Sequence, residues 1–138
     1  MQTSEGLVQA LEARTLPKSA FTHAAHVQAA WWYLRTHPLG AAMDRFRSTL
    51  RAYAESLGAS AKYHETMTVA WLLLIEERLG GDARTLDWPA FAGRCPELFD
   101  RHLLAQYYDA ETLASDRARR SFVMPARRPV PADATPSA

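Results

Sequence analysis

The sequence predicts an all-α fold, a single bundle of about five helices followed by a disordered, proline-rich tail. Apolar residues recur at steps of three and four along stretches with few Gly or Pro residues, as on one face of a helix. No useful length of chain alternates polar and apolar residues as a strand would. Residues 125–138 contain four prolines and too few apolar side chains to offset the entropy cost of ordering. We therefore expect a helical domain over residues 1–124 and a disordered tail over residues 125–138.

The first two helices are marked by their start and stop signals. Residues 4–14 carry apolar side chains at helical spacing, and this segment ends before Pro17. A second helix is expected to start at Thr22, whose hydroxyl suits an N-cap, and to continue through residues 23–35 without Gly or Pro. The dipeptide His37–Pro38 ends it, because a residue that precedes proline disfavours helical backbone.

The next two helices are longer and differ in polarity. Residues 39–57 place apolar side chains every three or four positions with charged residues between them, which predicts an amphipathic helix closed by Gly58. The fourth helix, from residue 60 or 61 to residue 79, is apolar nearly all round and stops at Gly80–Gly81. Because a helix without a polar face is normally buried, we expect this one at the centre of the bundle.

After residue 85 the pattern shortens. Short helices are expected over residues 88–93, 96–107 and 110–122, with Asp87, Asp109 and Ser115 among the residues that open them. These elements would close one end of the bundle.

Composition and charge exclude several classes of protein. The formal net charge is +1, with 16 Lys and Arg set against 15 Asp and Glu, so we expect no binding to nucleic acid. A single cysteine, Cys95, excludes an intrachain disulfide and every multi-cysteine metal site. The N-terminus has no basic and apolar leader pattern, and no stretch approaches the ~20 apolar residues of a membrane span. We therefore predict a cytoplasmic protein that does not contact membranes.

Two histidines at the start of the second helix are the first candidates for chemistry. His23 and His26 stand at positions i and i+3, so both imidazoles leave one face of the helix and could share an ion. The positive end of the helix dipole disfavours imidazolium, which keeps both rings neutral and suited to act as ligands or bases.

A third histidine, His64, opens the fourth helix beside Glu65. If the bundle runs up, down and up, the second and fourth helices are parallel, and His23, His26 and His64 converge at one end. Three imidazoles are a sufficient ligand set for one divalent transition metal, Zn, Fe, Cu, Ni or Co. Glu65 would act as general base or fourth ligand, although it projects about 100° away from His64 around the helix.

The surroundings of this predicted metal site suggest a small enzyme. Tyr63 is a candidate phenolic donor beside Glu65, and Trp31, Trp71 and Thr68 are candidates for a substrate pocket. Aromatic residues at helical spacing are, however, more often part of the core. A single buried cluster without a charged groove favours a small-molecule ligand over a polymer.

Two other interpretations stay open. The histidines and Glu65 can form an acid and base pocket without metal. They can also be structural, in a non-enzymatic binding or interaction domain whose near-continuous apolar run, residues 69–75, packs on a partner helix or a second copy as a homodimer.

Four blocks of the sequence resemble a group of small bacterial hypothetical proteins that carry the same blocks in the same order. They are the FTHAAH block at 21–26, YHET at 63–66, AQYY at 105–108 and LASDRAR at 113–119, and the resemblance covers about residues 20 to 125. It implies no catalytic assignment. It implies that His23, His26, His64 and Glu65 belong together as a unit.

Overall fold

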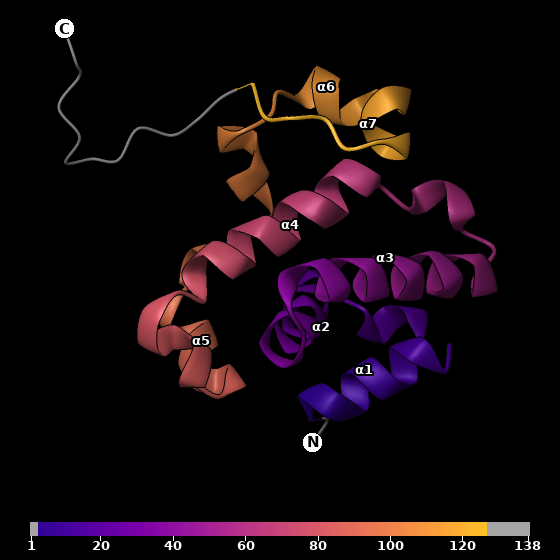
Figure 1. The fold of residues 1–138 in the computed structure, drawn as a ribbon. Helices are drawn as coiled ribbons and strands as arrows, with labels where there is room; N and C mark the ends of the chain where they lie inside the picture. Colours follow the sequence, from indigo (N-terminus) through magenta and orange to yellow (C-terminus); the bar gives the residue numbers. More distant parts are fainter. Residues whose placement is uncertain (1–2, 127–138) are drawn as a thin grey trace, which may run out of the picture.

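The computed structural model describes residues 3–126, and within that range it consists of helices and turns without a β-strand (Figure 1). This confirms the predicted all-α fold. The predicted disordered tail lies outside the described residues, apart from Pro125 and Ala126. The four longer helices are α1 (Ser4–Glu12), α2 (His23–Thr36), α3 (Leu39–Ser56) and α4 (Glu65–Arg78).

The first three helices form where the local signals predicted them. The hydroxyl of Thr22 accepts a hydrogen bond from the Ala25 N–H at 3.2 Å, so Thr22 is the N-cap of α2. Helix α3 buries its apolar stripe, which includes Phe46 and Leu50. After α3 the chain turns at Gly58, whose φ of 66° lies in the left-handed region that glycine adopts without strain.

Helix α4 is the most buried helix, as predicted, but it begins later than predicted. Residues Ser60–Lys62 form a separate 3₁₀ turn, and α4 starts at Glu65 with His64 as its N-cap. The Nδ1 atom of His64 accepts the Met67 N–H at 3.1 Å, which satisfies one of the N–H groups that a helix start leaves free. In the apolar run of residues 69–75, Leu73 alone is exposed.

The crossing of α2 and α4 differs from the predicted parallel arrangement. In Figure 1, α2 is viewed nearly along its axis, whereas α3 and α4 lie across the view. The start of α2 meets the middle of α4, because the rings of His23 and Trp71 touch edge to face with centroids 4.7 Å apart. Because side-chain ridges and grooves allow several crossing angles, two helices in contact need not be parallel.

The remainder of the described chain folds into short elements. They are α5 (Trp88–Arg94), the 3₁₀ helices Gly81–Thr85, Pro96–Phe99 and Arg101–Gln106, α6 (Ala110–Ala114) and α7 (Asp116–Arg120). Asp87, Asp109 and Ser115 all cap helices, as predicted. The predicted helix over 110–122 is wrong in its length, because the Ser115 hydroxyl accepts the Ala118 N–H and starts a new helix there.

The longest helix in residues 3–126 is α3, with 18 residues. No helix in this part of the chain combines the length and the hydropathy needed to cross a bilayer.

Candidate functional site

His23 and His26 lie close together at the start of α2. Their ring centroids are 6.3 Å apart and the ring planes differ by 12°. His23 donates from Nε2 to the carbonyl oxygen of Leu98 at 3.0 Å. His26 lies between two phenylalanines, with its ring centroid 5.9 Å from that of Phe21 and 5.2 Å from that of Phe46. The pair therefore faces aromatic core and a backbone carbonyl.

The ring of His26 is unusual because Nδ1 is enclosed without a hydrogen-bond partner among the described residues. Burial, with a smaller contribution from the charge of His23, lowers the pKa of His26 to about 4. The imidazole is consequently neutral at pH 7, but the cause is its burial and not the helix dipole from which neutrality was predicted. General base catalysis works best with a pKa near the operating pH, so His26 is a weak base for that task.

His64 is occupied on both sides of its ring. While Nδ1 caps α4, Nε2 donates to the carbonyl oxygen of Leu113 in α6 at 2.7 Å. These two bonds define the neutral tautomer that carries its proton on Nε2. Trp71, which contacts His23, stands seven positions further along α4, roughly 10 Å by the helix rise.

The structure does not bring the three histidines together as one ligand set. Among residues 3–126 no group of three or more His, Cys, Asp or Glu side chains is placed to hold a metal ion. For His64 to join His23 and His26 on a metal, it would have to give up the cap of α4 or its bond to Leu113. The three-histidine metal site stays a prediction.

Glu65 turns away from the histidines and enters an ion cluster with α3. Arg47 binds its carboxylate with two hydrogen bonds, from Nε to Oε1 at 3.1 Å and from Nη2 to Oε2. Arg51 adds a third bond to Oε1 at 3.3 Å, and the hydroxyl of Tyr63 donates to the same atom at 2.6 Å. The guanidinium of Arg51 also lies over the Tyr63 ring, 4.9 Å from its centroid.

This cluster fixes the protonation states of both predicted catalytic residues. Burial alone would raise the pKa of Glu65, but the hydrogen bonds from Arg47 and Tyr63 and the two arginine charges outweigh it and lower the pKa. Burial, followed by the hydrogen bond to Glu65, raises the pKa of Tyr63 to about 12. At neutral pH Glu65 is therefore a carboxylate and Tyr63 a phenol.

Of the three predicted pocket residues, Trp31 and Trp71 lie apart from this cluster, whereas Thr68 lies beside Tyr63. Trp31 is fully buried against Trp88 and Phe91, and Trp71 is buried beside His23. The hydroxyl of Thr68 donates to the backbone carbonyl of His64, one turn earlier, at 2.7 Å. The structure therefore places Trp31 and Trp71 in the core, and Thr68 at the edge of the Glu65 cluster.

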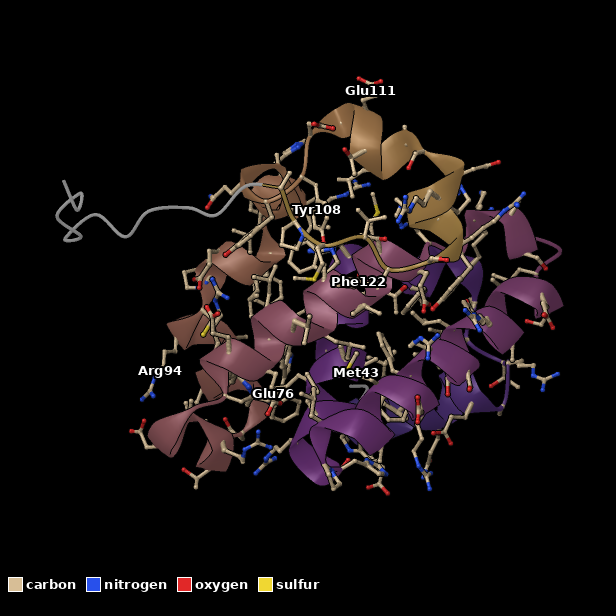
Figure 2. The ribbon with its side chains drawn as sticks, turned by 45° about the horizontal axis from the view of Figure 1, so that its top comes forward. Met43, Glu76, Arg94, Tyr108, Glu111 and Phe122 are labelled. Atoms are coloured by element: carbon tan, nitrogen blue, oxygen red, sulfur yellow. The ribbon has the colours of Figure 1, made fainter. Side chains whose placement is uncertain are left out.

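A shallow cleft of about 410 Å³ opens beside Glu65, between α3, α4 and the segment after α7. We call it the Glu65 cleft, and its lining combines a few charged groups with apolar walls. Figure 2 shows Met43 on α3 and Phe122 on the segment that follows α7, both beside α4. The lining residues are Gly40, Met43, Asp44, Arg47, Glu65, Val69 and Phe122.

Sequence analysis missed the two arginines of this site. Arg47 and Arg51 stand at i and i+4 on α3, and among the other charged residues of that helix they resemble an ordinary solvated face. A signal was nevertheless present, because Glu65 precedes an apolar helix and a buried carboxylate needs a cationic partner. An i,i+4 arginine pair on the neighbouring helix is such a partner.

The chain was compared with known proteins. No family model, curated protein or solved structure matches it. The assignment of function therefore depends on the site itself.

Proposed function

We propose that this protein is a small-molecule-binding helical domain and that the Glu65 cleft binds a small carboxylate with an apolar body. The observation that carries the proposal is the buried, ionised Glu65, which holds Arg47 at one end of a cleft with otherwise mainly apolar walls. Convergent polar groups with shifted pKa values beside an apolar wall are typical of ligand sites in proteins.

Arg47 supplies the group that would recognise a carboxylate. A guanidinium has five N–H donors, and Glu65 uses two of its nitrogens, Nε and Nη2. The remaining nitrogen, Nη1, lies 3.6 Å from Asp44, whose side chain is 81% exposed. Such an exposed ion pair contributes little to stability, so a ligand carboxylate can replace Asp44 at low cost.

The walls of the cleft favour an apolar body on that ligand. Met43, Val69 and Phe122 form its apolar surface, and its volume falls within the range of small-molecule sites. The lining lacks a row of basic side chains that a nucleic acid or other polyanion would need.

The proposal concerns binding rather than catalysis. A carboxylate with a lowered pKa that accepts four hydrogen bonds is a poor proton acceptor, and the Tyr63 hydroxyl donates one of those bonds and keeps its proton. Glu65 and Tyr63 would therefore orient Arg47 and Arg51 for recognition. Their predicted catalytic roles are not needed for this function.

Isothermal titration calorimetry with butanoate, hexanoate and phenylpropanoate tests the proposal, with alkylamines of matched size as controls. A phenylalanine at position 40 would add a ring at the lining of the cleft, and its Cβ would have no neighbour within 4 Å. We expect wild type to bind the carboxylates and Gly40→Phe to lose at least about tenfold in affinity.

Gly93→Phe is the matched control, because Gly93 is an equally open helical glycine outside the cleft lining. It should bind like wild type. Equal binding by Gly40→Phe and wild type, or a preference for the amines, would contradict the proposal.

The metal-dependent activity predicted from His23, His26 and His64 is a separate candidate. It is favoured by one observation, the enclosed Nδ1 of His26 without a partner beside the ring of His23. Elemental analysis of untagged protein tests it, after reconstitution with Zn, Fe, Cu, Ni or Co. Stoichiometric metal in wild type that is lost in both His23→Ala and His64→Ala would support one shared site, and no metal in wild type would remove the candidate.

A homodimer also stays a prediction. The prediction depends on an exposed apolar run at residues 69–75 of α4. In that run Leu73 alone is exposed, by 40%. Light scattering at several concentrations measures the oligomeric state directly.

A further inference from the structure

The segment that follows α7 is fastened to α4 by one buried side chain. Figure 1 shows this segment running back past α4 after α7. The hydroxyl of Thr66 donates to the carbonyl oxygen of Ser121 at 2.9 Å and accepts the Val123 N–H at 3.1 Å. Thr66 is fully buried, so no water competes for these two bonds.

Both bonds act on the residue between them, Phe122. The carbonyl of Ser121 belongs to the peptide unit before Phe122, and the N–H of Val123 belongs to the unit after it. Because peptide units are planar, holding both of them fixes the two backbone dihedrals of Phe122 and hence the direction in which its side chain leaves the chain.

A hydrogen bond from Tyr108 attaches the same residues, 121–123, to another part of the chain. The hydroxyl of Tyr108, a buried residue, donates to the carbonyl oxygen of Val123 at 2.6 Å. Hydrogen bonds between His64 and Leu113 and between Arg119 and Ala61 also attach the region from residue 109 to residue 126, in which Ala118 is the one fully buried side chain.

We infer that Thr66 is a positioning residue that sets Phe122 as a wall of the Glu65 cleft and thereby limits the size of the ligand. Phe122 lines the cleft together with Met43 and Val69, so its direction decides how far the apolar end extends. This inference rests on the proposed function, because it concerns a wall of the same cleft. It assigns a role in ligand selection to the fourth residue of the YHET block, Thr66.

Amide hydrogen exchange by NMR on the full chain tests the fastening without any ligand. Thr66→Val keeps the shape of the side chain but removes both bonds, and we expect the Val123 amide to exchange about tenfold faster. Thr66→Ser keeps the hydroxyl and should leave this rate at the wild-type value. Thr68→Val is the matched control, because Thr68 is a buried threonine of the same helix whose hydroxyl bonds the His64 carbonyl and not the segment after α7.

The affinity ratio for a bulky and a small carboxylate tests the role in selection. We expect Thr66→Val and Phe122→Ala to shift the ratio of phenylpropanoate to butanoate affinity by about threefold or more, with Thr66→Ser unchanged. A purely structural role would weaken both affinities equally and leave the ratio unchanged, which would overturn the inference. An unchanged Val123 rate in Thr66→Val would overturn it as well.

Two further outcomes remain informative. If Thr66→Val does not fold, Tyr108→Phe removes the other anchor of Val123 without touching Thr66, and the same affinity ratio is measured on it. If wild type binds neither acid, the proposed function fails, while a Val123 amide that responds only to loss of the Thr66 hydroxyl still supports the positioning of Phe122.

Discussion

The four long helices and the segment of residues 109–126 are held in place by different means. Helices α1 to α4 bury large side chains such as Phe46, Tyr33 and Leu72 against one another. The segment of residues 109–126 has Ala118 as its one fully buried residue, and hydrogen bonds from side chains to its backbone attach it to the rest. Apolar packing therefore holds helices α1 to α4 in place, whereas a few polar contacts attach residues 109–126.

This difference explains where the histidines and threonines of the sequence blocks are used. His23 bonds the carbonyl of Leu98, His64 bonds that of Leu113, and Thr66 bonds Ser121 and Val123. Each is a polar side chain of α2 or of the start of α4 that satisfies backbone groups in the C-terminal short elements. His64 and Thr66 thus join the two regions, while His23 attaches the 3₁₀ helix Pro96–Phe99 to α2.

The largest fall in the free energy of unfolding is expected when the ion cluster between α3 and α4 is broken. Glu65→Ala removes the acceptor of four hydrogen bonds, and because Arg47 stays partly exposed beside Asp44 we expect the free energy of unfolding to fall by about 3 kcal/mol. Asp44→Ala should change it by less than about 0.5 kcal/mol, because that carboxylate is exposed. Urea unfolding measures both, and equal effects of the two variants would break the comparison.

Acid should weaken the same region through His26. Its pKa is about 4 in the folded protein and 6.5 as the ordinary value, so the unfolded chain takes up a proton first as the pH falls. Stability should therefore drop between pH 6.5 and pH 4, by about 2 to 3 kcal/mol in all.

The control for this acid effect is His26→Leu, which has no group to titrate there. Its stability should be flatter over that pH range than that of wild type. Glu65 affects stability at lower pH than His26 does. Because the pKa of Glu65 is lowered in the folded protein, its contribution to the free energy of unfolding is lost as the pH falls below 4.5. Parallel pH profiles for wild type and His26→Leu would contradict the assignment.

His64→Ala should lower the free energy of unfolding by an intermediate amount. It removes one hydrogen bond to the start of α4 and one to Leu113 in the segment of residues 109–126. Loss of the α4 cap and of the bond to Leu113 is expected to cost about 2 kcal/mol. His64→Asn can restore the cap but is too short for Leu113, so about half of that loss should return. Limited proteolysis should cleave within residues 109–126 faster in both variants, and wild-type rates would contradict the attachment.

The smallest effect is expected in the C-terminal segment itself. Leu113 is half-buried at the edge of the core, and Leu113→Ala should reduce the free energy of unfolding by less than about 1 kcal/mol. Leu72→Ala, at a fully buried position of α4, should cost about 2 to 5 kcal/mol. If thermal unfolding showed similar losses of stability for Leu113→Ala and Leu72→Ala, the proposed difference between the two regions would be contradicted.

The sequence was sufficient for features that depend on neighbours along the chain. Thr22, Asp87, Asp109 and Ser115 were recognised as caps or turn residues because a short polar side chain can reach an N–H group two or three residues further on. Gly58 was recognised because a helix commonly ends at a glycine with positive φ.

It was insufficient for features that depend on how helices cross. The convergence of His23, His26 and His64 assumed that α2 and α4 are parallel, and nothing local determines a crossing angle. His64 was placed inside a helix because histidine is not among the preferred N-cap residues. The partners of Glu65 could not be identified, since Arg47 and Arg51 come from a different helix.

Long-range ¹H–¹⁵N correlation NMR of the histidine rings, recorded with and without one equivalent of Zn²⁺, most directly tests whether the histidines serve as links rather than as one metal centre. The account predicts a His64 ring protonated on Nε2 and a His26 ring that stays neutral down to about pH 4, both unchanged by the metal. A simultaneous shift of the His23, His26 and His64 ring nitrogens at one equivalent would contradict it.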